Sequence, residues 1–153
     1  MTSTSNPRPI CAERFTLKKP VVRARAYVAV AGLFEFSVNG QKIGSHSLDP
    51  MYTRFDRRNL YLTFDITDTL QPGENALGLI LGNGWYNHQS LAVWDFEKAP
   101  WRNRPRALVN IRLRYADGSE ETIASDAQWR ASTGPVVFNS IYTGEHHDAR
   151  LVN

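Results

Sequence analysis

Hydrophobic and polar residues alternate along most of this chain, with the two-residue period that is typical of β-strands. In residues 21–30, one set of side chains is expected to face the core: Val22, Ala24, Ala26, Val28 and Val30. Arg23, Arg25 and Tyr27 fall on the opposite face. This pattern predicts a long strand with one buried side and one side that faces solvent.

The same alternation, together with short apolar runs that end in turn residues, predicts eight to ten strands. They cover residues 12–17, 21–30, 33–38, 41–44, 60–66, 74–81, 105–115, 120–125, 129–131 and 136–142. We expect residues 12–17 to form an edge strand. Residues 74–81 are apolar at both odd and even positions, which favours a central strand that is buried on both sides.

Two dipeptides indicate tight hairpins between neighbouring strands. Asn39 and Gly40 form the strongest short hairpin signal, because both central positions of such a turn favour a positive φ. Asp117 and Gly118 predict a second two-residue hairpin in the same way. The sequence therefore fixes two places where adjacent strands must be antiparallel partners.

A short helical turn and a type II turn are expected just before the apolar strand at residues 74–81. Thr67 or Asp68 can cap the free backbone N–H groups of the helical turn. Pro72 and Gly73 fit the central positions of the type II turn, because proline presets the first φ and glycine supplies the positive second φ.

These elements define the fold class as all-β, since no stretch has the period of a long helix. Strands of this length with hairpins and long loops favour an antiparallel β-sandwich of jelly-roll or galactose-binding-like type. A chain of 153 residues is large enough for one domain with its own core. We expect residues 1–11 to be a disordered leader and residues 12–153 to be a single β-sandwich domain excised from a longer chain.

Composition argues against several classes of function. The formal net charge is +3, but the basic residues are dispersed, whereas a nucleic-acid surface needs a concentrated stripe. Cys11 is the only cysteine, so no intramolecular disulfide or paired-cysteine metal site can form. No run approaches the length of a membrane span, and residues 1–9 lack the apolar core of a signal peptide.

One pair of acids near the C-terminus suggests glycoside hydrolysis, a reaction that needs two carboxylates at a fixed separation. Glu145 and Asp148 lie three residues apart beside two histidines, but a structural cluster with Arg150 as counter-ion is the favoured interpretation. His146 and His147 would point to opposite faces of a strand and could not bind one metal ion. We therefore expect no catalytic residue in this chain.

The long loops at residues 45–59 and 87–104 carry a better functional signal, because aromatic residues gather where strands break. Candidate carbohydrate-binding residues are Trp85, Tyr86, Asn83, Trp94, Trp101, Asp49 and Asp56, with Asn87 as a further polar candidate. Indole rings can stack on the apolar C–H faces of sugars. Asp49, Asp56 and Asn83 could instead supply oxygen ligands to Ca²⁺. The alternative is that the tryptophans cover the end of the sandwich or pack on a neighbouring domain.

Several motifs carry a family resemblance. They are FSVNG with Ile43-Gly44, DITD with PGEN, GNGWY at residues 82–86, YADGS at residues 115–119, and IY, GE and DAR within residues 141–150. Together they resemble the N-terminal β-sandwich domain of bacterial α-L-rhamnosidases, in glycoside hydrolase family 78. The likeness covers nearly everything from Phe15 to Leu151. The first half alone is also similar to sugar-binding sandwich domains of family 2 glycosidases.

The resemblance implies an accessory domain ahead of a catalytic (α/α)₆ barrel, with the family's paired carboxylates in that barrel. It implies a rhamnose-containing glycan as partner, since some relatives bind terminal rhamnose through a Ca²⁺-dependent site. A periplasmic, cell-surface or secreted location is expected in preference to the cytoplasm.

Three functions follow from these observations. They are a structural or substrate-positioning accessory domain of an α-L-rhamnosidase, a Ca²⁺-dependent rhamnose-binding module, and a stand-alone interaction domain. If rhamnose binds, we expect Trp85 to be its stacking platform, with a dissociation constant in the millimolar range.

Overall fold

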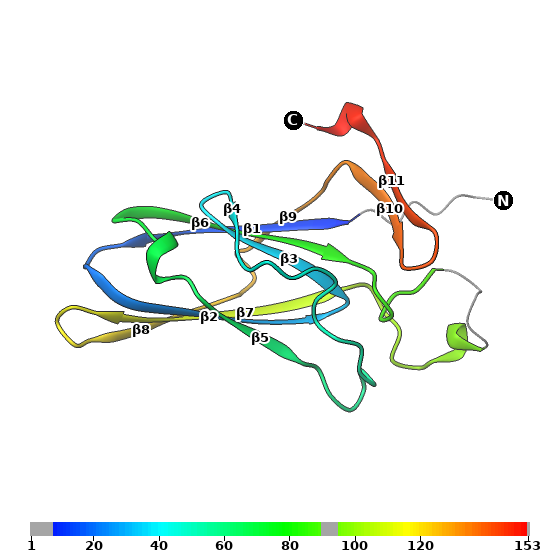
Figure 1. Cartoon of the computed structure of the whole chain (residues 1–153), viewed down its shortest axis with the longest axis horizontal. Coiled ribbons are helices and arrows are strands. Elements are labelled where there is room, and N and C mark those ends of the chain that lie inside the picture. Colours follow the sequence, from blue (N-terminus) through cyan, green and yellow to red (C-terminus); the bar gives the residue numbers. More distant parts are fainter. Residues whose placement is uncertain (1–7, 90–94, 153) are drawn as a thin grey trace.

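The computed structural model describes residues 8–89 and 95–152, and two antiparallel sheets face each other in it (Figure 1). The first sheet contains, in spatial order, β4 (Gln41–Lys42), β3 (Leu33–Val38), β6 (Gly73–Gly82), β1 (Pro9–Leu17) and β9 (Arg130–Thr133). The second contains β5 (Tyr61–Asp65), β2 (Val21–Ala31), β7 (Arg106–Tyr115) and β8 (Glu120–Ala124). The predicted all-β sandwich is therefore confirmed.

The remaining elements are short. A hairpin is formed by β10 (Val136–Ser140) and β11 (Gly144–His147). Within the described residues, the helices are three 3-10 turns: η1 (Thr67–Thr69), η2 (Phe96–Lys98) and η3 (Ala149–Leu151). None of the helices in residues 8–89 and 95–152 has the length and apolarity to cross a membrane.

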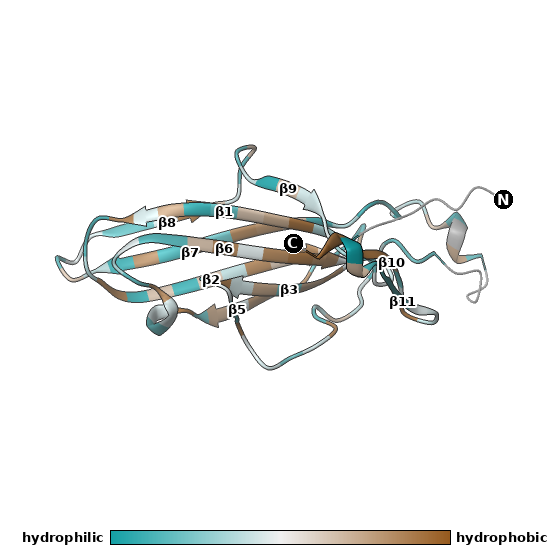
Figure 2. Ribbon diagram, turned by 90° about the horizontal axis from the view of Figure 1, so that it is seen from above, coloured by the Kyte–Doolittle hydropathy of each residue, from teal (hydrophilic) through white to brown (hydrophobic). Residues whose placement is uncertain are grey.

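The core lies between the two sheets and is formed by every second residue of the longest strands. Its members include Ala24, Ala26, Val28 and Val30 of β2, Phe34, Phe36 and Val38 of β3, Leu77, Leu79 and Leu81 of β6, and Val109, Ile111 and Leu113 of β7. Figure 2 shows the alternation as brown and teal segments along the strands. Since burying one such aliphatic or aromatic side chain contributes about 1.5–3 kcal/mol, this row of residues holds the sheets together.

Strand β6 is central, as predicted, but it is buried on one face and not on both. It pairs with β3 on one side and β1 on the other. Leu77, Leu79 and Leu81 are buried, whereas Ala76 is exposed and Ile80 is only half-buried. The outer row is not a second core, because Ala76 and Gly78 are small and Ile80 is only half-buried. A Cβ at Gly78, for example, would lie 2.5 Å from the hydroxyl of Ser37.

Two further predictions about the first strands are corrected by the structure. Strand β1 begins at Pro9, so the last three residues of the predicted leader belong to the sheet, and β9 covers its edge from Pro9 to Ala12. In β2, a register shift between Val21 and Arg23 turns Val22 out to solvent. An irregularity of this kind inserts one residue out of phase, and sequence alternation alone cannot reveal it.

The hairpin at Asn39 and Gly40 is confirmed, with φ angles of 51° and 79°. The Asp117 and Gly118 hairpin differs from the two-residue prediction. The backbone N–H of Tyr115 donates to Ser119, which leaves three loop residues, and only Gly118 has a positive φ. Such a loop combines a type I turn with a left-handed glycine, so one glycine is sufficient.

The short helical turn η1 is present, but neither Thr67 nor Asp68 caps it. Instead Asp65 accepts hydrogen bonds from the backbone N–H and the hydroxyl of Thr67, at 3.1 and 2.6 Å. An aspartate that bonds two residues ahead in this way forms an Asx turn, which serves the same purpose as a cap. Gly73 has a φ of 86°, as the predicted type II turn requires.

The C-terminal hairpin was predicted only in part. Strand β10 ends at Ser140, two residues before the predicted end, and the tail returns as β11, which the sequence did not predict. Arg8 ties the hairpin to the N-terminal strand by donating its N–H to Val136 and by an ion pair with Glu145. In Figure 1 the hairpin and both long loops gather at the same end of the sandwich.

Candidate functional site

The two long loops, the turn after β6 and the β10–β11 hairpin bring eight aromatic rings together at one end of the sandwich. Trp85 lies at the centre of one half of this aromatic end, with four rings around it. The ring centroids are 5.8 Å away for Tyr52, 5.1 Å for His88, 5.5 Å for Phe96 and 5.7 Å for Tyr142. All four pairs are tilted or edge-to-face, and edge-to-face packing is a favoured geometry for aromatic contacts.

The other half of the aromatic end is built around Tyr86, which is buried. Its ring is parallel to that of Trp101 within 12°, with centroids 6.4 Å apart, and Phe55 packs on both. Phe96 contacts Trp101 as well as Trp85 and so joins the two halves. Of the predicted aromatic site residues, Trp85, Tyr86 and Trp101 therefore meet, while Trp94 lies outside the described residues.

The break after β6 sets the position of Trp85. Gly84 has a φ of 51°, and a Cβ there would lie 2.9 Å from the side chain of Leu33. Only glycine avoids both the strained backbone and this contact. The core strand therefore ends in a turn that directs the indole of Trp85 into the aromatic end, where it is half-buried.

Asn83, a predicted sugar or calcium contact, has a structural role within this turn. Its side chain is 2% exposed and its amide N–H donates to the backbone carbonyl of Asn139 at 2.8 Å. Its backbone N–H donates to the Asn139 side chain at 2.7 Å, and its side-chain oxygen accepts from Asn87 at 2.8 Å. Both ends of the amide are thus occupied by protein partners.

The two predicted acidic contacts lie in the loop at residues 45–59, each beside a basic side chain. Asp49 is 3.3 Å from the imidazole of His46, and its backbone carbonyl accepts from Phe34 at 2.9 Å. Arg54 donates two hydrogen bonds to the carboxylate of Asp56. Hydrogen bonding to Arg54 holds the pKa of this carboxyl group below its usual range.

The proposed calcium ligands do not fit a metal site well. The oxygen of Asn83 is buried and already bonded to Asn87, and Asp56 is paired with Arg54. In the part of the chain that the structure describes, no group of three or more acidic, histidine or cysteine side chains could hold a metal ion. We therefore derive no role for calcium from these residues.

His88 is an unpredicted member of the aromatic end. It is 1% exposed, and neither ring nitrogen has a hydrogen-bond partner among the described residues. Burial lowers its pKa, and the nearby Arg102, which donates to its backbone carbonyl, lowers the pKa further. The imidazole is thus neutral at pH 7 and packs as an aromatic ring. In the sequence, only its position three residues after Trp85 indicated that His88 could belong to the aromatic end.

The carboxylates that could suggest catalysis are held by arginines. Glu145 lies 3.1 Å from Arg8, and Asp148 lies 2.6 Å from Arg150, which lowers the pKa of the Asp148 carboxyl. Neither pair lines any of the grooves described below. The predicted interpretation of this segment as a structural cluster matches these contacts.

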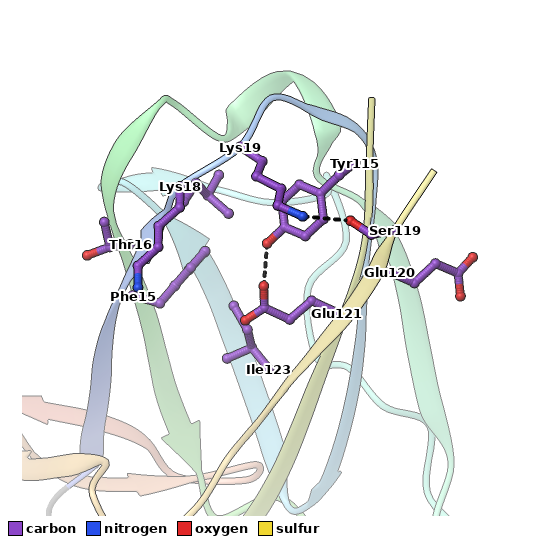
Figure 3. Close-up of a pocket in the computed structure, with 10 residues that line it drawn as sticks. Phe15, Thr16, Lys18, Lys19, Tyr115, Ser119, Glu120, Glu121 and Ile123 are labelled. Carbon is purple, nitrogen blue, oxygen red and sulfur yellow. Dashed lines mark hydrogen bonds between the residues drawn. The ribbon is translucent and has the colours of Figure 1, made fainter. Parts of the chain in front are cut away.

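A cleft at the opposite end of the sandwich is lined by side chains that bond to one another (Figure 3). It measures about 590 Å³ and lies between the turn at Lys18 and Lys19 and the hairpin after β7. Lys19 donates to Asp117 at 2.7 Å and to Ser119 at 3.1 Å, and its ammonium lies over the Tyr115 ring. The Tyr115 phenol donates to Glu121. These polar groups bond to one another and so join the turn after β1 to the hairpin between β7 and β8.

The two-sheet fold, together with the sequence motifs GNGWY at residues 82–86 and YADGS at residues 115–119, is that of an accessory β-sandwich domain of glycosidases. A protein-family model described as "Alpha-L-rhamnosidase N-terminal domain" matches residues 19–153. The chain belongs to this family, which confirms the resemblance seen in its motifs.

Relatives support the same assignment. The chain is 40% identical over 149 residues to an α-L-rhamnosidase of Formosa agariphila, covering 90% of this chain and 15% of that protein. It is 39% identical over 132 residues to one of Streptomyces avermitilis, covering 86% of this chain and 12% of that protein. The chain therefore spans a small part of the curated relatives that it matches, and in them this domain is part of a larger rhamnosidase chain.

Solved structures agree with the fold. The α-L-rhamnosidase of Streptomyces avermitilis, complexed with L-rhamnose, superposes with a TM-score of 0.87 at 36% identity, covering 96% of this chain and 14% of that chain. A lectin from Pleurotus ostreatus, at 20% identity, superposes with a TM-score of 0.56 over 88% of this chain and 32% of that chain. The lectin shares the sandwich fold.

Proposed function

We propose that this chain is a non-catalytic accessory domain of an α-L-rhamnosidase, with a structural or substrate-positioning role beside a catalytic barrel. The observation that carries the proposal is that this chain matches only 12–15% of the length of its α-L-rhamnosidase relatives. The ion pairs of Glu145 with Arg8 and of Asp148 with Arg150 support it, because they leave no free carboxylate pair at residues 145–148.

A domain exchange tests this role. The matching region of the Streptomyces avermitilis relative is deleted in one variant and replaced by this chain in another. We expect the deletion to lose activity or soluble expression and the replacement to restore it. A replacement as inactive as the deletion would contradict an accessory role. Comparing an aryl rhamnoside with a polymeric substrate separates the two forms of the role, since a positioning domain affects only the polymer.

A second candidate function is weak binding of L-rhamnose at the aromatic end. Trp85 is half-buried between Tyr52 and Tyr142, which are 53% and 57% exposed. These two tyrosines form an accessible aromatic rim, and the C6 methyl group of rhamnose suits such a surface. We expect a dissociation constant in the millimolar range, about −4 kcal/mol.

A nuclear magnetic resonance titration of the ¹⁵N-labelled chain with L-rhamnose tests this second function. Tyr142→Ala is the informative variant, because its side chain is exposed and its loss should leave the fold intact. Val22→Ala, which truncates a similarly exposed side chain at the start of β2, is the control. We expect saturable shifts around Trp85 that Tyr142→Ala weakens and Val22→Ala does not. Repeating the titration with Ca²⁺ shows whether a metal contributes.

A further inference from the structure

The outer face of the second sheet holds an aromatic hollow that lies apart from the aromatic end. Pairing across β5, β2 and β7 aligns Tyr61, Ala29 and Leu108 in one row. The neighbouring row contains Tyr27 and Asn110. These residues alternate with the buried residues of the same strands, so their side chains point away from the core.

The hollow forms because a small residue is surrounded by large ones. The methyl group of Ala29 leaves space between Tyr27, Tyr61 and Leu108, and the resulting groove measures about 560 Å³. Tyr61 and Leu108 are 64% and 52% exposed, although they are large and apolar. The rings of Tyr27 and Tyr61 are 6.1 Å apart and inclined by 53°, so they form two walls of one groove.

Towards the other end of the strands, the same face becomes cationic. A second hollow of about 220 Å³ shares Tyr27 and Arg112 with the first, and its lining adds three arginines: Arg23, Arg25 and Arg114. Together the two hollows form a trough that runs from tyrosines to arginines.

The arginines of the trough exceed its acids. Pairing places Asp65 beside Arg25 and Glu120 beside Arg114, so four arginines face two carboxylates. Glu120 is 3.9 Å from Arg112, and Asp65 accepts hydrogen bonds from Thr67 at the turn. Among the described residues, the other three arginines form no ion pair.

We propose that this trough binds an acidic oligosaccharide, a chain of pyranose rings that carry carboxylates. The apolar face of one ring would lie on Tyr61 and Tyr27. The carboxylate of the next would lie at Arg112, which lines both hollows, next to the three arginines without an ion pair in the second hollow; a planar guanidinium suits a carboxylate. The size of the groove lies in the range of small-ligand sites. The uncompensated arginines favour an anionic ligand over a neutral one, and the proposal is independent of rhamnose binding at the aromatic end.

The test is a nuclear magnetic resonance titration of the 153-residue chain with a linear trimer of galacturonic acid. Its methyl ester, which has the same rings without the charges, is the matched neutral ligand. We expect saturable shifts at β2, β5 and β7 with the acid, and weaker binding at high salt because exposed charges are screened.

Two exposed positions make the test specific. Tyr61→Ala should weaken binding of the acid about tenfold and Arg112→Gln about threefold, as expected for one stacking contact and one exposed ion pair. Tyr142→Ala, at the aromatic end, should leave this binding unchanged. The proposal is overturned by an absence of binding, by equal binding of the methyl ester, or by shifts confined to the aromatic end.

Discussion

The side chains of Asn83 and Asn139 join two segments that lie 56 residues apart in the sequence. The backbone N–H of Asn83 donates to the Asn139 side-chain oxygen, and the Asn83 amide donates back to the Asn139 carbonyl. Both residues are buried. This double hydrogen bond attaches the β10–β11 hairpin to the turn that positions Trp85.

We predict that Asn83→Ala lowers the free energy of unfolding by about 2 kcal/mol, because it leaves the Asn139 carbonyl and the Asn87 amide buried without their partner. Chemical denaturation measures the change. Gln41→Ala, an exposed amide at the end of the first sheet, is the matched control and should change stability by less than about 0.5 kcal/mol. Equal effects of the two substitutions would contradict the structural role of Asn83.

Trp85→Ala tests whether the aromatic end is packed or open. Removing an indole that contacts four rings should destabilise the chain by about 3 kcal/mol. Tyr142→Ala removes an exposed ring of the same cluster and should cost less than about 1 kcal/mol. Near-ultraviolet circular dichroism should lose more of its aromatic signal in Trp85→Ala than in Tyr142→Ala. If Trp85→Ala leaves stability unchanged, then Trp85 is an open stacking platform and the packing described here is wrong.

Gly40→Val should destabilise the chain by about 1 kcal/mol or more, because a β-branched residue is strained at a φ of 79°. A Cβ at this position would meet no atom within 4 Å, so the effect isolates backbone strain from crowding. Gly40→Asn is the control, since asparagine tolerates the left-handed region. Thermal melts of both variants should rank Val below Asn, and the reverse order would argue against the turn.

Stability should decline at alkaline pH because of Tyr115. Burial raises the pKa of its phenol to about 12, and the hydrogen bond to Glu121 and the nearby carboxylates act in the same direction. In the unfolded chain a tyrosine has a pKa of about 10. The fold therefore keeps a proton that the unfolded chain releases, and the stabilisation is present below pH 10 and lost as the pH rises towards 12.

The measurement compares melting temperatures of the wild type and Tyr115→Phe from pH 8 to 12. The phenylalanine variant lacks the titrating group, so its melting temperature should fall less steeply above pH 10. Parallel curves would mean that Tyr115 does not contribute to the pH dependence.

Much of the fold could be predicted because alternation and turn residues act locally. The strands of the core and the turn at Asn39 and Gly40 follow from neighbouring residues alone. Val22 was misplaced because a register shift depends on how β2 pairs with β7, which are far apart in the sequence. Thr67 or Asp68 was predicted to cap the helical turn, whereas Asp65 accepts the hydrogen bonds there. The sequence could not distinguish them, because several side chains at residues 65–68 could bond the same N–H groups.

The candidate site was predicted less completely, for a related reason. The sequence identified the aromatic loops, but not which rings face solvent. Asn83 looked like an exposed polar contact, and only its bonds to Asn139 and Asn87 show it to be buried. The trough at Tyr27 and Tyr61 was not predicted, because its residues come from three strands and meet only through pairing.

The central claim is that this chain is a non-catalytic accessory domain of an α-L-rhamnosidase. The most direct test measures whether the chain itself hydrolyses an aryl α-L-rhamnoside. Nitrophenol release is followed with the wild type, with Glu145→Gln and with buffer alone. We expect all three rates to be equal. Release above the buffer rate that Glu145→Gln abolishes would contradict it, because Glu145 would then act as a catalytic carboxylate and not as the partner of Arg8.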